Sequence, residues 1–154
     1  MSNLRDGQKM QGKVKISLKE AKTGKIVKHR EIHNKVVTDG RELVAKLFIG
    51  ELATPVTHMA VGSDGTEPSD EDHALRAEIG RVAMESLVVS TEDSTAKVKL
   101  TATFGTDISG PLQEAGIFTA ATGGIMYNRV TFPVINKGEN HTLTLEWEII
   151  FPPG

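Results

Sequence analysis

Residues 142–151, Thr-Leu-Thr-Leu-Glu-Trp-Glu-Ile-Ile-Phe, alternate between polar and apolar side chains. One face of this segment holds four apolar residues, Leu143, Leu145, Trp147 and Ile149. A period of two is typical of a β-strand that buries one face and exposes the other to water. The same alternation recurs over residues 12–19 and 96–104. These segments predict a framework of one-sided strands, with Trp147 in the core.

The other strand-like runs are short and are separated by turn-like sequences. The turns lie at residues 21–24, 91–94, 121–124 and 136–140. We therefore expect a mainly β protein, an antiparallel β-sandwich or partly open barrel of about eight strands with one short α-helix. Residues 79–90 are expected to form one of these strands, with some irregularity.

The expected helix follows residue 38, where the apolar period changes from two to the helical spacing. Leu43, Val44, Leu47 and Phe48 form its apolar stripe. Asp39 is placed to be the N-cap, with Glu42 three residues later, and Gly50 is placed to end the helix.

The sequence suggests one domain preceded by an arm. Residues 1–11 are expected to be a flexible N-terminal arm, and residues 12–154 a single β-sandwich domain that begins with a basic hairpin at 12–37. The N-terminal segment has no apolar region like that of a signal peptide, and no window approaches the ~18 apolar residues of a membrane helix. We expect no membrane partner.

Charge is divided unevenly along the chain. Residues 1–35 hold ten Lys and Arg against three Asp and Glu, a net charge of +7, whereas the remaining residues carry −9. Such a division favours head-to-tail contact between copies, or a basic arm that binds an acidic partner. The alternative is a solvated hairpin whose charges protect a sheet edge. Lys13, Lys15 and Lys19 are the candidate partner-docking residues.

No set of residues in the sequence suggests catalysis. The chain has no cysteine, and its five histidines are dispersed. A nucleophile with its base, a pair of tuned carboxylates or a metal-ligand motif is not recognisable. We expect no catalytic, cofactor-binding or metal site, although the carboxylates of residues 64–73 leave a structural calcium ion open. The basic hairpin lacks the interleaved aromatic residues of a single-strand nucleic-acid platform, so no specific nucleic-acid partner is expected.

Several short blocks in the middle and end of the chain resemble the N-terminal domain of phage tail-collar fibre proteins. The blocks are residues 40–47, 56–62, 75–81 and 112–118, the last with the family's E-x-G-[LI]-F pattern as Glu114-Ala115-Gly116-Ile117-Phe118. Residues 121–126 and 129–137 are similar to segments of related small phage proteins. Gly62 and Gly116, within these blocks, are expected to be required by the backbone.

The resemblance implies a non-enzymatic structural protein of the virion, made in the host cytoplasm. Its partners would be other copies of itself, most simply in a trimer, and other virion proteins of the tail or capsid. The expected role is a tail fibre, collar or baseplate adaptor. Two alternatives stay open: a capsid decoration or head-fibre protein, and a β-sandwich module that binds a glycan or a host protein.

Overall fold

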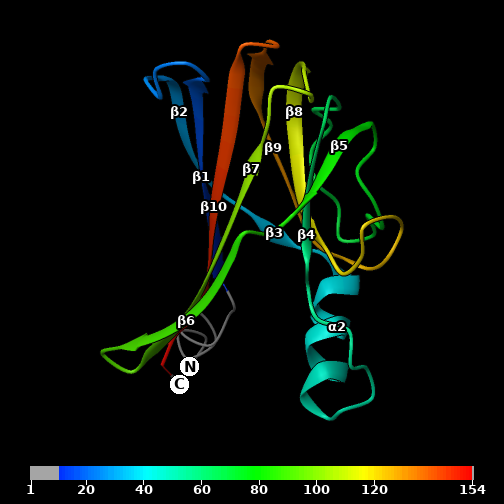
Figure 1. Cartoon of the computed structure of the whole chain (residues 1–154). Helices are drawn as coiled ribbons and strands as arrows, with labels where there is room; N and C mark the ends of the chain where they lie inside the picture. Colours follow the sequence, from blue (N-terminus) through cyan, green and yellow to red (C-terminus); the bar gives the residue numbers. More distant parts are fainter. Residues whose placement is uncertain (1–10, 154) are drawn as a thin grey trace.

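The structure, a computed structural model, describes residues 11–153. Ten strands in this range form two five-stranded antiparallel sheets that enclose the core, with a single helix at one end (Figure 1). Sheet A contains, in spatial order, β2 (Ile26–His33), β1 (Gln11–Glu20), β10 (His141–Phe151), β7 (Thr95–Phe104) and β6 (Ser86–Glu92). Sheet B contains β3 (Lys35–Val36), β9 (Met126–Lys137), β8 (Gly110–Phe118), β4 (His58–Gly62) and β5 (Glu78–Ala83).

The predicted β-sandwich class is confirmed, and the partly open barrel is not formed because the two sheets remain separate. The described strands number ten rather than about eight. One added strand is the two-residue β3, and another comes from residues 79–90, which were expected to form one strand. The structure corrects that expectation, because these residues divide between β5 in sheet B and β6 in sheet A.

The chain changes sheets at Met84 and Glu85. The Met84 amide donates to the Thr57 carbonyl beside sheet B, whereas the next amide, of Glu85, donates to Thr101 in sheet A, each at 2.9 Å. Sequence periodicity did not reveal this crossing because apolar residues continue on both sides of it.

The core is built from the inward faces of the alternating strands, as their period predicts. Trp147 of β10 is fully buried, which confirms its predicted place. Its Nε1–H donates to Oδ1 of Asn34 at 2.7 Å, so its one polar atom is satisfied. Asn34 lies where the chain passes from β2 in sheet A to β3 in sheet B. The Trp147 hydrogen bond therefore joins the centre of sheet A to this passage.

The N-terminal hairpin forms as predicted through the pairing of β1 with β2. Its expected range of 12–37 is too long, because Lys35 and Val36 form β3 and pair with Arg129 and Asn128 of sheet B. Most of the predicted arm, residues 1–10, lies outside the described residues.

Helix α2 (Thr38–Phe48) occurs where the periodicity places it, but its start differs from the expectation. Val37 is the N-cap and no side chain caps the helix, so the predicted N-cap role of Asp39 is wrong. Asp39 instead lies in the first turn, where its negative charge is favourable to the helix dipole. Gly50 follows the helix at φ +76° and its amide donates to Leu47, so the predicted end is confirmed.

The helix covers one end of the sandwich incompletely. An apolar groove of about 170 Å³ lies between α2 and the ends of β7 and β10. In Figure 1, α2 and the β6–β7 hairpin project at the same end of the molecule and diverge from each other.

Two glycines of the resembling blocks are required by close approach of other atoms, as expected. A Cβ at Gly62 would lie 2.4 Å from the carbonyl oxygen of Ala77 and 2.5 Å from Oε2 of Glu114. A Cβ at Gly116 would lie 2.8 Å from the carbonyl oxygen of Asn128. The backbone atoms among these neighbours cannot move without disturbing sheet B.

Gly62→Ala is expected to lower the free energy of unfolding by about 1–3 kcal/mol, because the added methyl group overpacks the β4 end. Gly105→Ala is the matched control, since its nearest neighbour is the end of the Asp107 side chain at 3.0 Å. The measurement is urea unfolding followed by the fluorescence of Trp147, the single tryptophan. Equal stability of the two variants would contradict the packing argument.

Candidate functional site

The predicted docking lysines lie on the solvent face of sheet A. Lys13, Lys15 and Lys19 alternate with the buried residues of β1, and all three are partly exposed. They are not on an edge of the sheet, because β1 is paired with β2 and with β10. The structure therefore brings the three together along one central strand.

Carboxylates from the neighbouring strands reduce the basic character of this face. Lys13 Nζ lies 3.9 Å from Glu31 and 3.8 Å from Glu148, and Lys15 is opposite Glu31 on one side and Glu146 on the other. Lys13 and Lys15 thus belong to a mixed charged surface, whereas Lys19 is opposite Thr142 and Ile26. The sequence alone suggested a patch of like charges. The strand register instead places glutamates of neighbouring strands beside lysines of β1.

The free edge of sheet A at β6 carries exposed apolar residues. Leu87, Val88 and Val89 are 53%, 52% and 71% exposed. Their side chains alternate between the two faces of the sheet, so both faces of this edge are apolar. β6 has no lysine or proline, the residues that usually protect an edge from pairing with another chain. It is therefore suited to pair with another strand.

The carboxylates of residues 64–73 point largely toward protein cations. Asp64 Oδ1 accepts from the Thr66 amide and lies 3.5 Å from Arg129, and Asp72 binds Arg76 and Arg129. Within residues 11–153, no three His, Asp or Glu side chains converge as metal ligands would.

Arg129 is the centre of a buried ionic network that the sequence did not predict. Both Arg129 on β9 and Glu114 on β8 are fully buried, and Nε of Arg129 donates to Oε1 of Glu114 at 2.9 Å. A second carboxylate, that of Asp72, accepts from Nη1 at 3.3 Å. Two further guanidinium hydrogen bonds go to the carbonyls of Thr66 and Asp64, at 2.8 and 3.2 Å.

The carboxylate of Glu114 also binds three backbone amides. Its Oε1 accepts from Arg76 at 2.9 Å, and its Oε2 accepts from Ala77 at 2.8 Å and from Asp64 at 3.2 Å. All three donors lie in residues 63–77, which connect β4 to β5 and are here called the connecting loop. Glu114 and Arg129 thus attach this loop to sheet B. Buried charges are tolerated when they are paired and fully hydrogen-bonded in this way.

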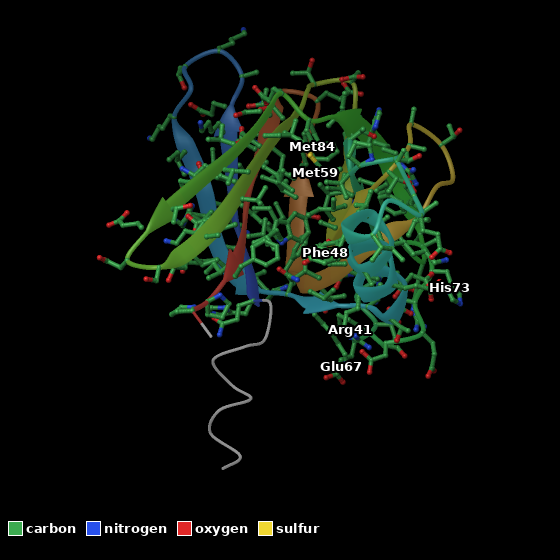
Figure 2. The ribbon with its side chains drawn as sticks, turned by 90° about the horizontal axis from the view of Figure 1, so that it is seen from below. Arg41, Phe48, Met59, Glu67, His73 and Met84 are labelled. Carbon is green, nitrogen blue, oxygen red and sulfur yellow. The ribbon has the colours of Figure 1, made fainter. Side chains whose placement is uncertain are left out.

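The same loop is attached to helix α2 by polar contacts at its surface. The Thr38 amide donates to the carbonyl of Asp70 at 2.9 Å, and His73 Nδ1 lies 2.6 Å from Oδ2 of Asp39. The hydrogen bond to Asp39 raises the pKa of His73 above its ordinary value. Figure 2 shows His73, Arg41 and Glu67 at the periphery of the molecule beside α2. The connecting loop therefore links sheet B to the start of the helix.

Burial alone would raise the pKa of Asp72, but hydrogen bonds and nearby positive charges outweigh it. The Ser69 amide, Arg76 and Arg129 favour the ionised carboxylate, and the pKa of Asp72 lies below its ordinary value of 3.8. Asp72 is consequently charged in the folded protein at neutral pH, as the pairing with Arg129 requires.

A third arginine holds the turn between β8 and β9. Arg81 of β5 donates to the carbonyls of Ala120 and Gly123, at 2.9 and 2.8 Å, and its guanidinium carbon lies 3.8 Å from the centre of the Phe118 ring. Arg81 and Glu114 lie in the blocks 75–81 and 112–118 described above, and Arg129 begins the segment 129–137. One available sequence indication was that Glu114 and Arg129 lie within strand segments that also contain core apolar residues, where a charge implies a buried partner.

Comparison of the chain with protein-family models, with curated proteins and with solved structures finds no match. In the part of the chain that the structure describes, no helix has both the length and the hydropathy needed to cross a bilayer.

Glu114→Gln is expected to lower the free energy of unfolding by about 3 kcal/mol, because the buried Arg129 loses its closest counter-charge. Glu146→Gln is the matched control, since Glu146 lies on the solvent face of sheet A, 3.6 Å from Lys99. An exposed pair contributes at most ~1 kcal/mol. Urea unfolding measures both variants, and an equally small loss for Glu114→Gln would contradict a structural role for the network.

Asp72 should make the protein sensitive to acid. Because its pKa is lower in the folded state, its contribution to stability is present above pH 3.8 and is lost as the pH falls through the folded pKa. Asp72→Asn should therefore show a smaller fall in melting temperature between pH 5 and pH 3 than the unmodified protein, because these pH values bracket the ordinary pKa of 3.8.

The control for this acid effect is Asp93→Asn. Asp93 lies in the exposed β6–β7 turn at φ +50°, a conformation that asparagine also adopts readily. This variant should keep the acid sensitivity of the unmodified protein. If Asp72→Asn behaves in the same way as this control, Asp72 is not a source of the acid sensitivity.

Proposed function

We propose that this protein is a non-enzymatic structural subunit of a tailed phage or phage-like particle. It acts as a tail fibre, collar or baseplate adaptor that associates with copies of itself and docks onto other virion proteins. The observation that carries the proposal is the exposed apolar edge at β6, a strand available for pairing at the margin of a well-packed sandwich. A surface of this kind favours association over the binding of a small substrate.

The position of the resembling blocks supports the proposal. Gly62, Arg81, Glu114 and Arg129 each come from a different block. Gly62, Glu114 and Arg129 meet in sheet B through close packing and a buried ion pair, and Arg81 holds the turn between β8 and β9. In the segments that resemble phage proteins, these residues hold loops and turns against a sheet. Such residues maintain a rigid scaffold, which is what a particle subunit requires.

The aromatic side chains favour this proposal over a glycan-binding module. Six of the seven in the chain are buried or partly buried, and Phe48 at the end of α2 is the exception at 90% exposure. Figure 2 shows Phe48 on the helix, apart from the connecting loop. A sugar-binding platform would use several exposed aromatic rings, and the described part of this protein has one.

The test is to separate purified particles into heads and tails and to identify the fraction that contains this chain by mass spectrometry. Enrichment in tails is expected. Enrichment in heads would replace the adaptor role with that of a capsid decoration or head-fibre protein. Absence from both fractions, with the chain detected in lysed cells, would contradict a virion role.

A further inference from the structure

The two free edges of sheet A differ in charge and share exposed apolar residues. Along β6 and its flanks, Glu85, Glu92 and Asp93 are acidic and no residue of the range 85–93 is basic. Along β2 and its first flanking residue, Lys25, Lys28 and Arg30 are basic and Glu31 is the one acidic residue. Each edge also exposes aliphatic side chains, Ile26 and Val27 on β2, and Leu87, Val88 and Val89 on β6.

These charges are not neutralised within the described part of the molecule. Glu31 lies near Lys13, and no carboxylate of residues 11–153 lies within ion-pair distance of Lys25, Lys28 or Arg30. The same ion pairs include none of the acidic residues at the β6 edge. The two edges therefore carry opposite charges that form no ion pairs among the described residues, and they are electrostatically complementary.

We infer that the β6 edge of one copy pairs with the β2 edge of the next copy, so that sheet A continues from subunit to subunit. This inference deepens the self-association in the proposed function and rests on it. The occupant of the apolar β6 edge is a second copy of this chain. Pairing would cover the exposed aliphatic residues of both edges and bring the basic β2 edge against the acidic β6 edge.

The register of sheet A fixes the direction of the contact. Four antiparallel pairings separate β2 from β6, through β1, β10 and β7, so β2 and β6 run in the same direction within one subunit. A head-to-tail repeat of subunits with a common strand direction therefore gives a parallel seam. When the starts of the two strands are aligned, Lys25 lies beside Glu85 and Val27 beside Leu87.

A two-fold contact between two β6 edges is the competing arrangement. It would be antiparallel and would bring Glu85 of one copy near Glu92 and Asp93 of the other. Like charges directly opposite each other across strands are destabilising. Charge thus favours the head-to-tail seam, which produces a ring when the rotation between subunits closes and a filament when it does not.

Two variants, each altered at one edge, test the seam. The β6-edge variant carries Val89→Lys and Glu92→Lys, and the β2-edge variant carries Val27→Glu and Lys28→Glu. All four residues lie on the edges of sheet A outside the buried core, so the fold should survive, which circular dichroism and Trp147 emission verify. Val134→Lys on β9, another exposed aliphatic position, is the control away from both edges.

Sedimentation velocity of the full chain measures the outcome. We expect the unmodified protein and the Val134→Lys control to sediment as oligomers, and each edge variant to sediment as a monomer. An equimolar mixture of the two edge variants should recover association, because each supplies the intact edge that the other lacks. High salt should weaken association of the unmodified protein.

The remaining outcomes overturn the seam in distinguishable ways. If the β2-edge variant stays dimeric while the β6-edge variant is monomeric, the contact is the two-fold β6 arrangement. If both variants stay oligomeric, the seam is wrong and self-association through another surface stands. A monomeric unmodified protein would remove both the seam and the self-association in the proposed function.

Discussion

The buried pair of Arg129 and Glu114 is the interaction on which the arrangement of sheet B and its loops depends. A buried guanidinium group needs several acceptors, and here they come from β8 and from the connecting loop. Glu114 in turn satisfies three amides of the same loop. Removing either charge would leave the other buried without its partner, which is strongly destabilising. The network therefore specifies one position for a loop that has little regular secondary structure of its own.

This network engages two of the loop carboxylates that the sequence presented as possible calcium ligands. Asp64 and Asp72 are spaced closely in the sequence, which left a calcium site open, but their oxygens face Arg129 and Arg76. In sequence the acidic cluster and the arginine of β9 are far apart. The pairing of β4 with β8 and of β8 with β9 brings them together.

The fold was predictable to the extent that its strands have one buried face. The segments around Val14, Leu100 and Trp147 alternate clearly, and their place in the core was predicted correctly. The passage at Met84 and Glu85 was not, because apolar residues on an exposed edge such as β6 resemble those of a buried strand. The N-cap at Val37 was also missed, since that position has no polar side chain and is instead fully buried.

The neighbours of β10 have a consequence for how the chain folds. β10 pairs with β1, from the opposite end of the described chain, and with β7. During synthesis, β1 can pair early with β2, but its second neighbour, β10, is made after every other described strand of the two sheets. Long-range pairing of this kind slows folding and leaves strand edges exposed in the incomplete chain. The nascent chain therefore cannot complete sheet A until β10 has left the ribosome.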